Sequence, residues 1–161
     1  MLRIRQARPE DHTEISVLVV TTFGQNNEHR LIEALRAAGA VTLELVALLE
    51  DRIVGHVCFS RFDVPPGWWV LAPVSVTTAY QNRGIGSELV RYGLDQARQQ
   101  RAGAVVVVGN PDYYRRFGFV FDGPAHLSSP YPAQYTGLYP IAPETAAAAV
   151  ALRYPAAFEE A

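Results

Sequence analysis

The stretch that decides the fold reads Val74-Ser75-Val76-Thr77-Thr78-Ala79-Tyr80-Gln81-Asn82-Arg83-Gly84-Ile85-Gly86-Ser87. A strand-like segment leads into a loop with two glycines, and the loop opens an amphipathic helix from about residue 85 to residue 100. Free backbone N–H groups at a helix start point the same way, and the helix dipole adds positive potential there. Because glycine has no Cβ, a phosphate can approach the backbone closely. The stretch therefore predicts a site for a phosphate-bearing ligand.

Two other phosphate loops do not fit this stretch. A P-loop requires Gly-Lys-Ser/Thr, but the chain has no lysine, since its 14 Lys-or-Arg positions are all arginine. A dinucleotide-binding Gly-x-Gly-x-x-Gly loop needs a third glycine where Leu89 stands. The pattern Gln/Arg-x-x-Gly-x-Gly/Ala is satisfied by Gln81, Gly84 and Gly86. Here the sequence resembles the GNAT superfamily of N-acetyltransferases, in which such a loop holds the diphosphate of coenzyme A.

A second segment strengthens the resemblance. It follows an apolar run at residues 104–108 and reads Asn110-Pro111-Asp112-Tyr113-Tyr114-Arg115-Arg116-Phe117-Gly118-Phe119. In the family, an asparagine ends the equivalent strand, and Tyr-x-x-x-Gly-Phe ends the helix after it. Tyr114 stands four residues before Gly118, where the family often carries its general acid. Tyr113 is about 100° further round a helix, so the two tyrosines cannot both face one site. Arg115 and Arg116 are expected on a solvated face.

The resemblance implies acetyl-CoA as the co-substrate and direct transfer of its acetyl group. The acceptor is expected to be a primary amine of a small molecule or of a protein N-terminus. Tyr114 is expected to protonate the departing thiolate. The residues expected to bind the coenzyme are Val74, Ser75 and Val76 for the pantetheine amides, Gln81, Asn82, Arg83, Gly84, Ile85, Gly86 and Ser87 for the diphosphate, and Asn110 with Tyr114. No metal is expected.

The general base is left open by the sequence. The residues considered for it are Glu28, His29, Asp63 and Ser75, the last through a water. We favour Glu28, because the corresponding helix in the family borders the acceptor cleft. Five aromatic residues either line an acceptor pocket or cover the core: Trp68, Trp69, Tyr131, Tyr135 and Tyr139. A non-catalytic acyl-CoA sensor and an enzyme for another donor, such as succinyl-CoA, are the competing functions.

Composition excludes several classes of function. Without lysine there is no Schiff-base nucleophile, because arginine stays protonated. The net charge of −2 argues against nucleic acid as a constitutive partner. The single cysteine, Cys58, suits a reducing compartment, and residues 1–5 lack the apolar run of a signal peptide. No stretch approaches the ~18 apolar residues of a membrane span. We therefore expect a cytoplasmic protein with no membrane partner, either a monomer or a homodimer.

The chain of 161 residues fits a single domain. We expect a core at about residues 3–122 and a C-terminal extension at 123–161 that completes the sheet or the acceptor site. The predicted order is β-α-α-β-β-β-α-β-α-β, with a hairpin at residues 43–62 and a last strand beginning at Phe119. The segment 144–154 can be read as helix or as strand. The class is α/β (α+β): a mixed, mostly antiparallel central sheet flanked by helices in a GNAT-like fold. Within the strand at 69–76, Pro73 fits an edge or a bulge.

Overall fold

The computed structural model describes residues 1–159. Its centre is a six-stranded sheet in the order β1-β2-β3-β4-β5-β7. The strands are β1 (Arg3–Gln6), β2 (Val41–Leu49), β3 (Arg52–Arg61), β4 (Trp69–Val76), β5 (Ala104–Val108) and β7 (Thr136–Pro140). Neighbouring strands are antiparallel except β4 and β5, which run parallel. The sheet is therefore mixed and mostly antiparallel, and the predicted fold class is confirmed.

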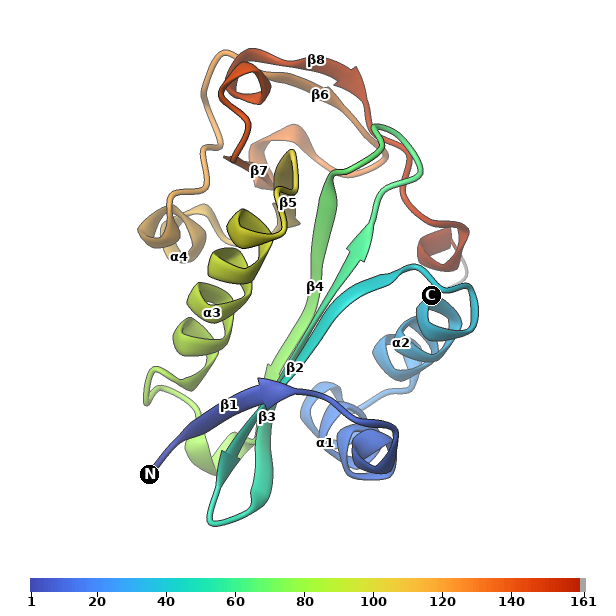
Figure 1. Cartoon of the computed structure of the whole chain (residues 1–161), viewed down its shortest axis with the longest axis vertical. Helices are drawn as coiled ribbons and strands as arrows, with labels where there is room; N and C mark the ends of the chain where they lie inside the picture. The colour runs from blue at the N-terminus through green and yellow to red at the C-terminus, as the bar shows by residue number, and fades with distance from the viewer. Residues whose placement is uncertain (160–161) are drawn as a thin grey trace.

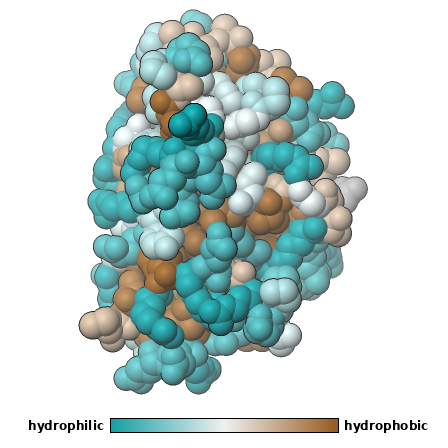
Figure 2. Space-filling view, in the orientation of Figure 1, coloured by the Kyte–Doolittle hydropathy of each residue, from teal (hydrophilic) through white to brown (hydrophobic). Residues whose placement is uncertain are grey.

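Helices cover both faces of this sheet (Figure 1). On one side lie α1 (His12–Phe23) and α2 (Asn27–Ala37), and on the other lie α3 (Ile85–Gln99) and α4 (Pro111–Tyr114). A small parallel ribbon of β6 (His126–Ser128) and β8 (Ala149–Ala151) stands at the top of the view. Figure 2 shows hydrophilic side chains over most of this face, with apolar residues reaching the surface mainly between them. Within residues 1–159, no helix is long and apolar enough to cross a membrane.

Backbone geometry explains where several elements end. The β2–β3 hairpin turns at Glu50 and Asp51, whose φ angles are +50° and +63°, and positive φ at both central residues is typical of tight hairpins. α2 stops before Gly39, which takes a φ of +66°. Glycine adopts this left-handed conformation without a Cβ penalty, so it commonly follows a helix end.

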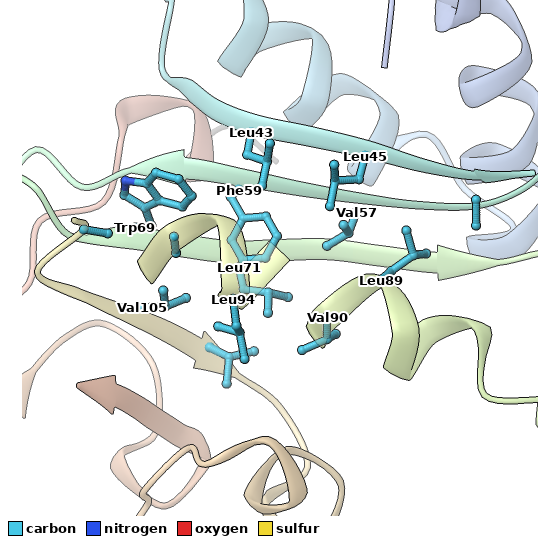
Figure 3. Packing of buried hydrophobic residues seen from close by; sticks show 14 of the residues in the cluster. Leu43, Leu45, Val57, Phe59, Trp69, Leu71, Leu89, Val90, Leu94 and Val105 are labelled. Carbon is cyan, nitrogen blue, oxygen red and sulfur yellow. The ribbon is translucent and has the colours of Figure 1, made fainter. Parts of the chain in front are cut away.

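The main core lies between α3 and the sheet (Figure 3). Phe59 of β3 points toward the helix, where Leu89 and Leu94 pack around it, and Trp69 meets it edge-on with ring centroids 5.9 Å apart. The helix has no side chain at Gly93. A Cβ there would lie only 2.2 Å from Phe59 Cε1. Gly93 therefore sets how closely α3 approaches the sheet.

Two predicted segments differ in the structure. The strand predicted from Phe119 is wrong: Val120 makes a single bridge with Leu138, and β7 takes the place beside β5. Gly118, with a φ of +105°, turns the chain just before that point. The segment 144–154 combines both interpretations, because a 3-10 helix at Pro143–Ala147 is followed by β8. β7 comes from the predicted extension at 123–161 and completes the main sheet.

The sheet opens between β4 and β5. These strands pair only at Trp69 with Val105 and at Val70 with Val106. Further along, β4 bulges against β3, because Ala72 and Pro73 together stand opposite one β3 residue. Proline has no N–H to give to a ladder, so a bulge accommodates it, as the sequence predicts. The second half of β4 therefore keeps an unpaired edge toward β5.

Candidate active site

A cleft of about 660 Å³ lies where β4 and β5 diverge. This volume is typical of ligand sites. The cleft is lined by Thr22, Phe23, Val74, Ser75, Val76, Tyr80, Gln81, Asn82, Gly84, Ile85, Gly86, Ser87, Tyr113 and Arg116. A second pocket of about 160 Å³ lies beside β7, and no charged side chain lines it. The larger cleft gathers nine of the twelve predicted coenzyme-binding residues, all but Arg83, Asn110 and Tyr114, so it is the candidate active site.

The loop before α3 presents free backbone donors to this cleft. The first α3 hydrogen bond runs from the Glu88 amide to the Gly84 carbonyl at 3.0 Å. The amides of residues 82–87 find no acceptor among the described residues. Gln81 Nε2 donates to the Val76 carbonyl at 2.9 Å, which ties the loop to the end of β4. With the dipole of a 15-residue helix behind it, the loop forms an anion site.

Arginine side chains add positive charge beside the loop. Arg116 lines the cleft, its Nε donates to the Tyr113 carbonyl at 2.9 Å, and its guanidinium lies 4.5 Å from the Tyr113 ring centroid. Arg83 is exposed and lies over the Tyr80 ring at 5.2 Å. Free amides, two cations and glycine backbone are the groups that a diphosphate requires. The residues present thus fit the diphosphate of a coenzyme.

Tyr113 and Tyr114 occupy different surroundings. Tyr113 lines the cleft, and its hydroxyl lies 3.2 Å from Ser87 Oγ. Tyr114 does not line the cleft, and its ring packs so closely on Gly109 that a Cβ there would lie 2.6 Å away. Burial, with a smaller contribution from Tyr113, raises the pKa of Tyr114 to about 12. Its hydroxyl is therefore protonated at neutral pH, and it has no hydrogen-bond partner within residues 1–159.

The other predicted site residues are distributed unevenly. Asn110 caps α4, since its Oδ1 accepts from the backbone amide two residues on at 2.9 Å, and it lies outside the cleft lining. Of the residues considered as the base, Ser75 lines the cleft. Glu28 accepts a hydrogen bond from the Gln25 side chain at 3.1 Å at the start of α2, and neither it nor Asp63 lines the cleft. His29 likewise lies outside, paired within α2 with a glutamate.

Several residues of the cleft carry no recognisable signal in the sequence. Arg116 was expected on a solvated face, yet it lines the cleft together with Thr22 and Phe23 from the end of α1. No motif marks these positions, because tertiary packing alone brings them to β4. Trp68 and Trp69, by contrast, pack into separate clusters, so the predicted aromatics do not form one pocket. No group of three His, Cys, Asp or Glu side chains in the described chain could hold a metal ion.

A buried polar cluster lies behind the cleft. His56 is fully buried, and its Nε2 lies 2.7 Å from Glu44 Oε2, while Arg36 Nε donates to Glu44 Oε1 at 3.1 Å. Burial alone raises the pKa of Glu44, but the hydrogen bonds from His56 and Arg36 outweigh this effect and lower it to about 2. Glu44 is therefore ionised inside the protein. Burial raises the pKa of the neighbouring Cys58 thiol, so that thiol stays protonated.

The split sheet and the free amides at the α3 start are features of an N-acetyltransferase that uses a coenzyme. Comparison with known families agrees. The chain belongs to the Acetyltransferase (GNAT) family, whose family model matches residues 13–119. The resemblance found in the sequence is thus confirmed, and the protein is an acetyltransferase of this family.

Two curated relatives come from Escherichia coli (strain K12). The N-acetyltransferase YhbS is 37% identical over 120 residues, which cover 72% of each chain. The N-acetyltransferase YjhQ is 32% identical over 132 residues, which cover 78% of this chain and 71% of that one.

Two solved structures show the same fold. YhbS from Escherichia coli in complex with CoA matches with a TM-score of 0.91 and 28% identity, covering 98% of this chain and 92% of that one. A GNAT family acetyltransferase from Brucella melitensis in complex with acetyl-CoA matches with a TM-score of 0.84 and 35% identity, covering 98% of both chains.

Proposed function

We propose that the protein transfers the acetyl group of acetyl-CoA to a primary amine of a small molecule or of a protein N-terminus in the cytoplasm. The observation that carries this proposal is the row of free amides at residues 82–87, which opens onto the cleft. The Brucella melitensis relative was crystallised with acetyl-CoA, which supports the same donor here. Whether the protein acts as a monomer or a homodimer stays a prediction.

The unpaired edge of β4 supports binding of the pantetheine arm. Beyond Val70, β4 makes no pair with β5, so backbone groups of Val74–Val76 are available on that side. An extended chain with amides can add to such an edge as a strand would. The diphosphate would then reach the amides of residues 82–87 and the guanidinium of Arg116. When bound, acetyl-CoA supplies a thioester whose carbonyl carbon an amine can attack.

Direct transfer fits the residues of the site. The single cysteine, Cys58, is fully buried and protonated, so it offers no thiolate nucleophile. An alkyl ammonium group has a pKa near ~10.4 and must lose a proton before it attacks. The transfer therefore requires a proton acceptor for the amine and a proton donor for the leaving sulfur.

Two tyrosines compete for the role of proton donor. We assign it to Tyr114, because its hydroxyl has no hydrogen-bond partner among the described residues, whereas the Tyr113 hydroxyl contacts Ser87. Tyr114→Phe should lower turnover by about a hundredfold with unchanged coenzyme affinity. Tyr113→Phe is the matched control and should weaken coenzyme binding more than turnover. The reverse pattern would transfer the role to Tyr113, which lines the cleft. Glu28 stays the sequence-based prediction for the base.

The deciding experiment measures free thiol released from acetyl-CoA in the presence of a broad amine panel that includes peptides with free N-termini. We expect release above the amine-free background with at least one member. A melting midpoint that rises with acetyl-CoA, without release for any amine, would instead favour an acyl-CoA sensor. A larger rise with succinyl-CoA than with acetyl-CoA would point to another donor.

A further inference from the structure

His56 and Ser75 are neighbours on the face of the sheet that α1 and α2 cover. Side chains alternate along a strand. Val57 packs toward α3, so the preceding His56 faces the other side, and Ser75 does the same between Val74 and Val76. His56 and Ser75 are paired across β3 and β4. Such cross-strand neighbours have Cβ atoms about 4.5–5.5 Å apart, so their side chains are within reach of each other.

The hydrogen bond to Glu44 fixes which imidazole nitrogen carries the proton. The ionised carboxylate can only accept, so His56 Nε2 must donate, and in the neutral ring Nδ1 is then the acceptor. His56 Nδ1 and Ser75 Oγ are both buried, and neither has a hydrogen-bond partner in the described part of the chain. Buried polar groups are nearly always paired. No hydrogen bond joins the two atoms in this structure, so the pair leaves an unused donor and an unused acceptor on neighbouring strands.

We propose that Ser75, His56 and Glu44 form a proton relay that accepts a proton from the acceptor's ammonium group in the cleft. This inference rests on the proposed function. Ser75 is among the residues that line the cleft, although its Oγ is itself buried, and it is the member of the relay that would meet the ammonium group. His56 and Glu44 are positioning residues that act through it, as the histidine and carboxylate do behind a serine hydroxyl in hydrolase triads.

The relay and Tyr114 together account for both protons that the ammonium group loses. The ammonium group gives one proton to Ser75 Oγ while the serine's own proton passes to His56 Nδ1, and Glu44 stabilises the resulting imidazolium. The neutral amine then forms the N–C bond as the C–S bond breaks. The second proton of the amine ends on the sulfur, through Tyr114 as the donor. His56 returns the first proton to water once the product leaves.

The surroundings of His56 contain few other charges. Glu44 comes from β2, Arg36 from α2 and Cys58 from its own strand, while β4 contributes the uncharged Ser75. From α1, the carboxylate of Glu14 accepts the Ile53 amide at 2.9 Å, further along β3. Arg36 and Glu44 compensate each other, and the Cys58 thiol is protonated. His56 is thus the basic side chain paired with Ser75 across β3 and β4.

The test compares Ser75→Ala and His56→Gln with the wild type, using acetyl-CoA and the amine with the highest turnover in the panel. Both variants should lower kcat about a hundredfold near about pH 7. The gap should close toward about pH 10, where the amine loses its proton unaided. Acetyl-CoA affinity, measured by calorimetry, should stay unchanged. Ser60→Ala and His126→Gln are the controls, since Ser60 is a buried, unpartnered serine outside the cleft and His126 is exposed.

Wild-type kcat values in both variants would overturn the relay. A decrease in kcat of the same size at every pH would also overturn it, because it would indicate that Ser75 and His56 have a structural role alone. If the wild type turns over no amine, the proposed function fails, and the relay is then decided by nitrogen NMR of labelled histidine. The relay requires an unprotonated Nδ1 on His56 whose resonance shifts in Ser75→Ala and not in Ser60→Ala. A protonated Nδ1, or a resonance unaffected by Ser75→Ala, overturns it.

Discussion

Replacing Gly93 with alanine tests how tightly α3 is held against the sheet. Two effects oppose each other. Alanine in the interior of a helix is favoured over glycine by about 0.5–1 kcal/mol. However, the new Cβ would lie 2.2 Å from Phe59 Cε1 and 2.3 Å from Phe59 Cζ, whereas carbon atoms pack at about 3.5–4.0 Å.

The clash with Phe59 should outweigh the helix preference of alanine. Phe59 is fully buried and held edge-on by Trp69, so its ring cannot move away without displacing the core. Overpacking of this kind costs about 1–3 kcal/mol. With the helix preference subtracted, Gly93→Ala should lower the free energy of unfolding by up to about 2.5 kcal/mol.

Urea denaturation measures this change as a lower midpoint at an unchanged slope. The matched control is the double variant Gly93→Ala with Phe59→Leu. Leucine shortens the side chain that the new methyl group meets, so Gly93→Ala should cost less in the Phe59→Leu background than alone. A Gly93→Ala variant that is more stable than the wild type would show that helix preference dominates, and would refute the close approach of α3.

Three further predictions concern the loop, the buried carboxylate and the cleft arginine. Gly84 has a φ of +82°, so Gly84→Ala should strain the loop by about 1–2 kcal/mol and weaken CoA binding about tenfold. A Cβ on Gly86 meets nothing closer than 3.4 Å, so calorimetry should show a smaller loss of CoA affinity for Gly86→Ala. Equal losses of affinity in the two variants would contradict the role of the positive φ at Gly84. The pKa of Glu44 is lowered from its ordinary 4.5 to about 2, so the ionised carboxylate stabilises the fold above about pH 4.5, and this contribution of about 3 kcal/mol is lost as the pH falls toward 2. In urea unfolding, Glu44→Gln should therefore lose less stability than the wild type between about pH 6 and pH 3. Parallel curves of stability against pH would disprove the lowered pKa of Glu44. Arg116→Gln should weaken CoA binding and reduce its salt dependence, whereas an unchanged salt slope would place this guanidinium away from the phosphates.

The cofactor loop could be predicted because its information is local. Gln81, Gly84 and Gly86 lie within six positions of one another, and a strand before them and a helix after them supply the context. β7 could not be found in this way, because its pairing with β5 depends on contacts about thirty residues apart. The apolar residues from Phe119 are as strand-like by composition, yet the chain turns at Gly118 and Val120 makes a single bridge with Leu138.

The His56–Glu44 contact shows why a hairpin can hide a functional pair. Near the turn, Leu48 pairs with Ile53, and one residue later Ala47 pairs with Gly55. A regular hairpin would place His56 and Glu44 on opposite faces of the sheet, because a one-residue slip exchanges the faces. The bulge restores them to one face and makes their hydrogen bond possible. Sequence patterning predicts the hairpin, but it does not reveal the extra residue.

The divergence of β4 from β5 also affects how readily the ligand-free protein aggregates. An open strand edge can recruit a foreign strand and seed aggregation. Here that edge lies inside the sheet, between β4 and β5, and Pro73 with its bulge makes it a poor template. The same edge that would accept the pantetheine arm is thus kept from accepting another chain. The ligand-free protein should therefore resist strand addition at this edge.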